Sequence, residues 1–393
     1  EIAQCLVGSE MCIRDSDNAA TTFPKPRSVY QAWGNAMTRY GANPGRAGHA
    51  LSAATSQAVF TSRNKCAEFF GAEPENTVFT LNCTHALNQA IKGLFRPGAH
   101  YVLSDIEHNA VIRPVHALTA RGGSYTLFET SQDAAATLRS ASEAIRPETA
   151  ALICTAAGNV TGQRLPVWEL AALCRRKKVC FIVDAAQGAG LLPLSLKDGI
   201  NIICTAGHKG LYGPMGTGLM LTDGKYPLNT FMEGGTGSAS ESVEQPDFLP
   251  DRFESGTINT PGAIALGAGV DFVTRRTPER ILSHETALCR SFCSQLRRIP
   301  GIIVYSTIDD QPELYAPVVS FAVEGVPSAE ASAELSRMGF CMRGGLHCAP
   351  LAHKKLGTLE EGTVRFAPSA FNTQDEVNAL TRALRMKKWN YGK

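Results

Sequence analysis

The sequence predicts an α/β fold, with a mostly parallel sheet sandwiched by helices and a smaller α+β domain towards the C-terminus. From about residue 27, short apolar runs alternate with segments of helical periodicity, which is the pattern of βαβ units. The apolar runs are nearly continuous, as in strands that helices cover on both faces. After about residue 260 a long helical stretch leads into strand-like segments, which indicates a change of architecture.

The expected elements follow in chain order. In the first part, helices are expected at 52–70, 84–95, 109–121 and 166–178, and strands at 77–81, 101–103, 150–155, 179–183, 201–205 and 218–222. In the later part, strands are expected at 301–305, 316–323 and 363–367, and helices at 262–298, 328–338 and 373–387. The helical stretch 262–298 is interrupted near Thr277-Pro278, because proline lacks the amide hydrogen that a helix interior needs. The Gly-, Ser- and Pro-rich stretch 234–262 is expected to be an ordered functional loop.

The chain length favours two domains. With 393 residues, the chain is longer than one simple core accommodates. We expect a larger domain over 17–262 and a smaller C-terminal domain over 263–393. Residues 1–16 show no clear periodicity, so they are interpreted as an atypical prefix outside the core.

Composition excludes several functional classes. The 38 Lys and Arg residues nearly balance 36 Asp and Glu residues, and the net charge of +2 favours neither nucleic acid nor an anionic membrane as a partner. No apolar run approaches the roughly 18 to 20 residues that span a bilayer. Most of the twelve cysteines lie in apolar stretches and none forms a Cys-x-x-Cys pair, so no disulfide framework or metal site is expected. This use of cysteine predicts a reducing, cytoplasmic location.

Three of the predicted strands end in polar residues. Asp184 and Lys209 follow the consecutive strands 179–183 and 201–205. Thr84 lies where the earlier strand 77–81 meets a helix start. Ligands of open α/β sheets gather at the carboxyl ends of the strands. Pyridoxal phosphate (PLP) requires an amine, a carboxylate beside its pyridine nitrogen, and helix-start amides for its phosphate. The three strand ends together therefore predict a PLP site.

Each of these residues also has a structural interpretation when it is taken alone. Asp184 could cap a turn, Lys209 could be a solvated surface cation, and Thr84 could be a helix cap. The glycine-rich run Gly210–Gly218 is a weak phosphate-loop signal, since it lacks the Gly-Lys-Ser/Thr ending of a nucleotide-binding loop. The prediction depends on the combination and order of the three strand ends.

Several longer motifs resemble one family. They are Asp17-Asn18-Ala19-Ala20-Thr21-Thr22, Asp184-Ala185-Ala186-Gln187, Gly207-His208-Lys209-Gly210-Leu211-Tyr212-Gly213-Pro214, Arg252-Phe253-Glu254-Ser255-Gly256-Thr257, Arg343-Gly344-Gly345-Leu346-His347-Cys348-Ala349-Pro350 and Thr363-Val364-Arg365-Phe366. Together they are similar to the cysteine desulfurase family of the class V aminotransferases, whose fold is PLP fold type I. The resemblance extends from Asp17 to about residue 387.

The resemblance implies a role for each matching residue. Lys209 would hold PLP covalently and move the substrate Cα proton, and Asp184 would pair with the ring nitrogen. Arg365 would bind the substrate carboxylate through its planar fork. Further implied contacts are a catalytic His108 stacked on the ring, Asn159 and Gln187 at the ring hydroxyl, Thr84 and His208 at the phosphate, and Thr257 at the phosphate of the neighbouring subunit in a homodimer.

Structural interpretations remain for some of these residues, and the motifs depart from the family in places. His108 could be a core histidine, Asn159 a turn residue, and Arg365 one half of a structural ion pair. Ala206 stands where the family usually has a hydroxyl residue near the phosphate. Leu346 replaces the first of two histidines before the cysteine in the most similar desulfurase pattern.

Cys348 differs from the other cysteines because a loop with Arg343 and two glycines surrounds it. Nearby positive charge favours the reactive thiolate, although an incidental loop cysteine would fit the same context. The resemblance implies that Cys348 takes sulfur from L-cysteine as a persulfide, releases alanine, and passes the sulfur to an acceptor protein or thiol. A selenocysteine lyase or another class V aminotransferase or lyase is the alternative activity, and a non-catalytic scaffold for sulfur transfer is the alternative of another class.

Overall fold

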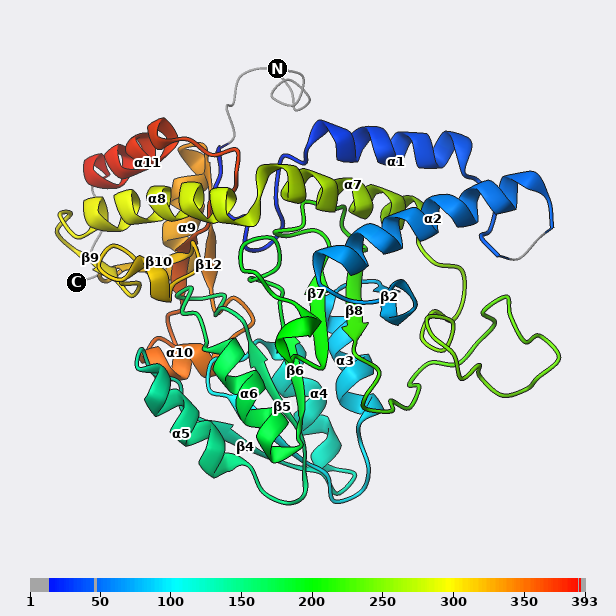
Figure 1. The fold of residues 1–393 in the computed structure, drawn as a ribbon. Helices are drawn as coiled ribbons and strands as arrows, with labels where there is room; N and C mark the ends of the chain where they lie inside the picture. The colour runs from blue at the N-terminus through cyan, green and yellow to red at the C-terminus, as the bar shows by residue number, and fades with distance from the viewer. Residues whose placement is uncertain (1–13, 46–47, 388, 390–393) are drawn as a thin grey trace. The chain divides into compact units, whose positions relative to one another are not determined.

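The computed structural model describes residues 14–45, 48–387 and 389 (Figure 1). The predicted prefix therefore lies mostly outside the described residues, but Arg14–Asp15 form a short strand, β1. Contacts divide the chain into two compact units. The larger unit comprises Lys25–Ala156 and Leu165–Pro278, and the smaller comprises Glu1–Pro24, Ala157–Arg164 and Glu279–Lys393. The boundary after residue 262 stays a prediction.

A seven-stranded sheet forms the centre of the larger unit, in the order β2-β8-β7-β6-β5-β3-β4. The strands are β2 Thr77–Thr80, β3 His100–Ser104, β4 Ser124–Phe128, β5 Thr149–Thr155, β6 Cys180–Asp184, β7 Ile202–Ala206 and β8 Gly218–Thr222. Strands β3 to β7 pair in parallel, whereas β8 runs antiparallel to both of its neighbours. The predicted mostly parallel α/β sheet is thus confirmed.

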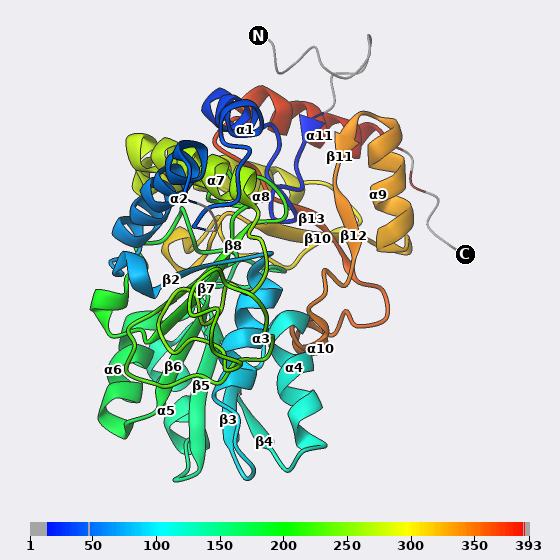
Figure 2. The ribbon, with the colours of Figure 1, turned by 90° about the vertical axis from the view of Figure 1, so that its right-hand side faces the viewer.

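Helices cover this sheet, whose inner strands β5 to β8 are buried and mostly apolar. In Figure 2, α5 and α6 lie to one side of the strands and α3 and α4 to the other. The helices of this unit are α1 Arg27–Arg39, α2 Ala50–Phe69, α3 Cys83–Gly93, α4 Asn109–Thr119, α5 Ala134–Ala144, α6 Val167–Lys177 and α7 Thr260–Arg276. Buried apolar side chains of α3, α4 and the sheet form one core cluster, which holds the strand ends in fixed positions.

The smaller unit contains a four-stranded antiparallel sheet in the order β12-β13-β10-β9 and the parallel pair β1-β11. Its strands are β9 Ile302–Val304, β10 Val319–Val323, β11 Phe340–Cys341, β12 Arg343–Gly345 and β13 Thr363–Phe366, and its helices are α8 Pro278–Leu296, α9 Ser328–Arg337, α10 Pro350–Leu356 and α11 Gln374–Met386. Phe292 of α8 packs against Phe321 and Phe366 of the sheet, with ring centroids 5.8 and 4.5 Å away. This α+β unit agrees with the predicted change of architecture.

Several elements were not predicted. Strand β4 pairs only with β3 in the sheet order, and most of its residues are partly exposed, so it lacks the continuous apolar run of the inner strands. Helix α5 is rich in alanine and serine, and Asp133 caps its start by accepting bonds from the amides of Ala135 and Ala136. Single-turn 3-10 helices are found at Pro74–Asn76, Leu196–Asp198 and Pro312–Leu314. Within the described ranges, no helix is long and apolar enough to cross a membrane.

Candidate active site

Asp184 lies at the carboxyl end of β6 in the larger unit. The strand is buried along its whole length, and the Asp184 side chain is only 3% exposed. Its Oδ1 accepts bonds from the Ala186 amide at 2.9 Å and from the Cys83 thiol at 3.4 Å. The carboxylate is therefore anchored by the turn after its own strand and by the first residue of α3.

Lys209 follows β7 in a turn and is half-buried. Its positive charge reaches Cys83 and lowers the pKa of that thiol. Burial and the negative charge of Asp184 act in the opposite direction and together raise the Cys83 pKa well above its ordinary value. Lys209 and Asp184 thus act in opposite directions on the pKa of the same thiol. Cys83 itself was not singled out in the sequence, since a cysteine at a helix start gives no signal of this contact.

Thr84 is the second residue of α3 and is exposed. Asn82 caps this helix, because its Oδ1 accepts a bond from the His85 amide at 2.9 Å. The remaining first-turn amides and the helix dipole make this terminus suited to an anion. Gly218 of β8 packs directly on Asn82, and an added Cβ would stand 2.6 Å from the Asn82 carbonyl carbon, so this close approach requires glycine.

His208 lies beside two cations. The Lys25 ammonium donates a bond to the His208 carbonyl at 2.6 Å. Burial, Lys209 and Lys25 lower the pKa of the His208 imidazole to about 4, so this ring is neutral near pH 7. Gln187 is half-buried in the turn after β6. Lys25 was missed by sequence reasoning, because no motif or spacing connects it with the residues after β7.

His108 caps the start of α4. Its Nδ1 accepts a bond from the Ala110 amide at 3.0 Å, so a neutral His108 carries its proton on Nε2. The ring is half-buried. His108 therefore caps a helix, a structural task that the sequence analysis did not predict for it.

Glu107, directly before His108, is a buried carboxyl that the sequence analysis gave no role. It is 0% exposed and its Oε1 accepts bonds from the Ser104 hydroxyl and, at 2.8 Å, from the Thr155 amide. Burial raises the Glu107 pKa to about 8, with a smaller contribution from the charge of Asp184. A glutamate three residues after the end of strand β3 was the one sequence signal available for it.

Thr257 belongs to the loop before α7 and is exposed. Its Oγ1 accepts a bond from the Asn43 amide at 3.3 Å. It lines a cavity of about 200 Å³ that also includes His85 and Thr217. Thr257 is thus accessible to a ligand or to a second chain.

Arg365 lies in the middle of β13 in the smaller unit and is only 1% exposed. One guanidinium nitrogen contacts Asp17 Oδ1 at 2.7 Å, and the other donates to the Asn159 carbonyl at 3.1 Å. Burial lowers the Arg365 pKa, and the Asp17 carboxylate counters that effect. The Nε atom has no hydrogen-bond partner within the described part of the chain. A buried arginine with an open donor can bind a further carboxylate.

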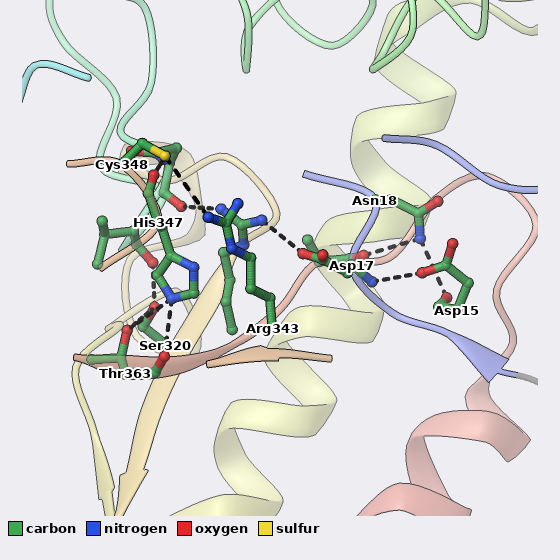
Figure 3. Close-up of polar contacts among 12 residues, drawn as sticks. Asp15, Asp17, Asn18, Ser320, Arg343, His347, Cys348 and Thr363 are labelled. Atoms are coloured by element: carbon green, nitrogen blue, oxygen red, sulfur yellow. Dashed lines mark hydrogen bonds and ion pairs between the residues drawn. The ribbon is translucent and has the colours of Figure 1, made fainter. Parts of the chain in front are cut away.

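Cys348 is exposed, whereas the other described cysteines are buried or, for Cys341, half-buried. It lies between β12 and α10, and one Arg343 guanidinium nitrogen stands 3.8 Å from its sulfur (Figure 3). The loop therefore presents an accessible thiol beside a cation.

His347 turns away from this thiol. Its Nε2 donates to the Thr363 carbonyl at 3.0 Å, and the side chain is 2% exposed (Figure 3). Burial and the charge of Arg365 lower the His347 pKa to about 2, so it supplies no positive charge to Cys348. Asn159 is 9% exposed and its amide nitrogen donates to the His347 carbonyl at 2.6 Å. Asn159, Arg365 and the cysteine loop are thereby joined in one network.

Comparison with known proteins places the chain in a family. The family model described as Aminotransferase class-V matches residues 16–380. A probable cysteine desulfurase of Methanothermobacter thermautotrophicus is 30% identical over 93% of each chain. A probable cysteine desulfurase of Halobacterium salinarum is 31% identical over 94% of this chain and 90% of its own. A longer relative from Mycolicibacterium paratuberculosis, also named probable cysteine desulfurase, is covered over 54% of its length.

Solved structures agree with these matches. The apo structure of a cysteine desulfurase from Thermococcus onnurineus has a TM-score of 0.88, with 29% identity over 95% of this chain and 94% of its own. The cysteine desulfurase CsdA from Escherichia coli, at 23% identity, shares the fold with a TM-score of 0.83. Both sequence and fold show that this chain belongs to the class V aminotransferase family.

Proposed function

We propose that the protein is a PLP-dependent cysteine desulfurase. It would convert L-cysteine to L-alanine and leave the sulfur on Cys348 as a persulfide. The observation that carries this proposal is the Cys348 loop: an accessible thiol beside Arg343, in a unit that also holds a buried arginine with an open donor. The names of the full-length relatives support the same reaction.

The larger unit fits PLP. Asp184 is a buried carboxylate suited to a protonated pyridine nitrogen, and Lys209 would supply the amine from the turn after the neighbouring strand β7. Two cations beside His208, together with the start of α3, suit a phosphate group. His108 would stack on the ring, and Gln187 would contact its hydroxyl, a contact that the family resemblance also implies for Asn159 of the smaller unit. When bound, PLP supplies an electron sink that stabilises negative charge at the substrate Cα.

The protein side chains would divide the remaining work. Arg365 would bind the substrate carboxylate, using the Nε donor that has no partner among the described residues. The Lys209 amine would carry the proton that leaves and later returns to the substrate Cα. The Cys348 thiolate would attack the substrate sulfur, so that the new S–S bond forms as the substrate C–S bond breaks.

This reaction balances without a further reductant or oxidant. L-Cysteine and the Cys348 thiol give L-alanine and a Cys348 persulfide, and a separate acceptor thiol or protein then takes the outer sulfur. Thr257, exposed at its cavity, would reach the PLP phosphate of a second chain, so the working enzyme would be a homodimer.

The test is the Cys348→Ala variant, assayed with PLP and L-cysteine. Removing the nucleophile should lower persulfide-dependent alanine formation by at least about a hundredfold. Cys341→Ala, which removes a half-buried cysteine of the same unit, should keep activity. Mass spectrometry of the wild type should find one added sulfur on the Cys348 peptide. Full amino-group transfer by Cys348→Ala would indicate an aminotransferase, and a strong preference for selenocysteine over cysteine would indicate a lyase.

A further inference from the structure

The loop that carries Cys348 has an unfavourable backbone conformation. His347 and Cys348 are consecutive non-glycine residues with φ of +50° and +58°. Each such residue costs on the order of 1 kcal/mol and persists only where surrounding contacts enforce it. Since the Cys348 side chain is exposed, the enforcing contacts must act on its neighbours.

Among the described residues, the shortest hydrogen bond to this loop comes from a distant segment. Asn159 Nδ2 donates a hydrogen bond to the His347 carbonyl at 2.6 Å. This carbonyl belongs to the peptide bond between His347 and Cys348. Asn159 is nine-tenths buried, and its own segment is anchored on both sides. The Ser320 hydroxyl donates to the Val160 carbonyl at 2.5 Å, and the Gly158 amide donates to the Gln163 carbonyl at 2.9 Å.

We infer that Asn159 is a positioning residue that clamps the Cys348 loop in its left-handed conformation. The inference gains its functional meaning from the proposed role of Cys348. The Asn159 side-chain amide then has two contacts: the His347 carbonyl within the protein, and the cofactor contact that the family resemblance implies.

The clamp also connects the thiol loop with Arg365. The Arg365 guanidinium donates a hydrogen bond to the Asn159 carbonyl at 3.1 Å. Asn159 therefore contacts Arg365 through its main chain and the His347 carbonyl through its side chain. Asp17 occupies the other terminal nitrogen of Arg365 at 2.7 Å. Two hydrogen bonds, from Arg365 to Asn159 and from Asn159 to His347, therefore connect the Arg365 guanidinium with the peptide of Cys348.

Hydrogen exchange on the full chain, without cysteine, tests the clamp. The Ala349 amide donates to the Leu346 carbonyl at 2.9 Å and reports on the integrity of the loop. Asn159→Ala should accelerate exchange in the 344–349 peptide about fivefold, because a hydrogen bond contributes about 1 kcal/mol. Asn159→Asp, which keeps the shape but cannot donate, should give the same acceleration or more.

Asn372→Ala is the matched control. Asn372 is an equally buried asparagine of the same unit, 8% exposed, and its amide bonds to Asp15 rather than to the loop. This variant should leave exchange at 344–349 unchanged. Unchanged exchange in both Asn159 variants would overturn the clamp, as would equal acceleration in Asn372→Ala. Because no turnover is measured, failure of the proposed reaction would leave this result intact.

A second readout connects the clamp with chemistry. In a single turnover with PLP and cysteine, Asn159→Ala should slow persulfide formation on Cys348 at least about fivefold, together with its faster loop exchange. A changed absorption spectrum together with wild-type loop exchange would show that Asn159 acts through the cofactor alone, and the clamp would be rejected.

Discussion

Single residues in this protein owe their chemistry to burial as much as to their type. Glu107 and Asp184 are both carboxyls at strand ends of the larger unit, and both are almost completely buried. Burial raises the Glu107 pKa to about 8, although its Oε1 accepts from Ser104 and Thr155. A neutral Glu107 close to Asp184 avoids placing two negative charges in one apolar region.

The raised pKa of Glu107 predicts how the stability of the protein depends on pH. A folded-state pKa of about 8, above the ordinary value of 4.5, means that the folded protein binds this proton more tightly than the unfolded chain does. The contribution of Glu107 to the free energy of unfolding is therefore greatest below about pH 4.5 and falls as the pH rises towards 8. Glu107→Gln imitates the neutral acid. It should therefore reduce the decline in the free energy of unfolding between pH 5 and 8, measured by urea unfolding.

The control for this experiment is Glu169→Gln, an exposed glutamate in the first turn of α6. It should leave the pH dependence of unfolding close to that of the wild type. If Glu107→Gln and the wild type gave parallel curves over the whole range, Glu107 would ionise normally despite its burial.

At the scale of elements, His108 at the start of α4 has an observed structural task and a proposed chemical one. His108 Nδ1 caps the helix by accepting from the Ala110 amide, while Nε2 carries the proton of the neutral ring. An N-cap contributes about 1 kcal/mol to stability, and asparagine is among the best caps. The two tasks can therefore be separated by substitution.

We expect His108→Ala to lower the free energy of unfolding by about 1 kcal/mol, and His108→Asn to stay within about 0.5 kcal/mol of the wild type. Both variants lose the ring, so both should lose most of the alanine formation from cysteine. Thermal unfolding and product analysis on the same samples check this. Full activity in His108→Asn would show that the ring has no chemical role.

Elements with a strong local signal were predicted well. Strands β5, β6, β7 and β8 are continuous apolar runs, and the structure confirms each within one or two residues at its ends. Strand β4 and helix α5 escaped prediction because β4 is partly exposed and α5 is mostly small residues. Propensity and periodicity are weak where an element does not bury one continuous face.

For the whole molecule, the proposed function predicts a homodimer. Sedimentation velocity should give about twice the mass of one chain. Thr257→Val removes a hydroxyl at an exposed position, and loss of a hydrogen bond to a charged phosphate should weaken PLP binding about tenfold. The control is Thr119→Val, at the exposed end of α4. A monomer that binds PLP with full affinity would contradict the role of Thr257.

The sequence by itself determined the alternation of strands and helices, and it placed Asp184 and Lys209 after consecutive strands. These features depend on local periodicity and turn chemistry, which a few neighbouring residues encode. The partners of the buried polar groups were decided by tertiary structure alone. Cys83 and Asp184 are 101 residues apart, Asn159 and His347 are 188 apart, and Asp17 and Arg365 are 348 apart. A buried donor or acceptor must find a partner, but which distant group becomes that partner is fixed only when the strands and loops pack together.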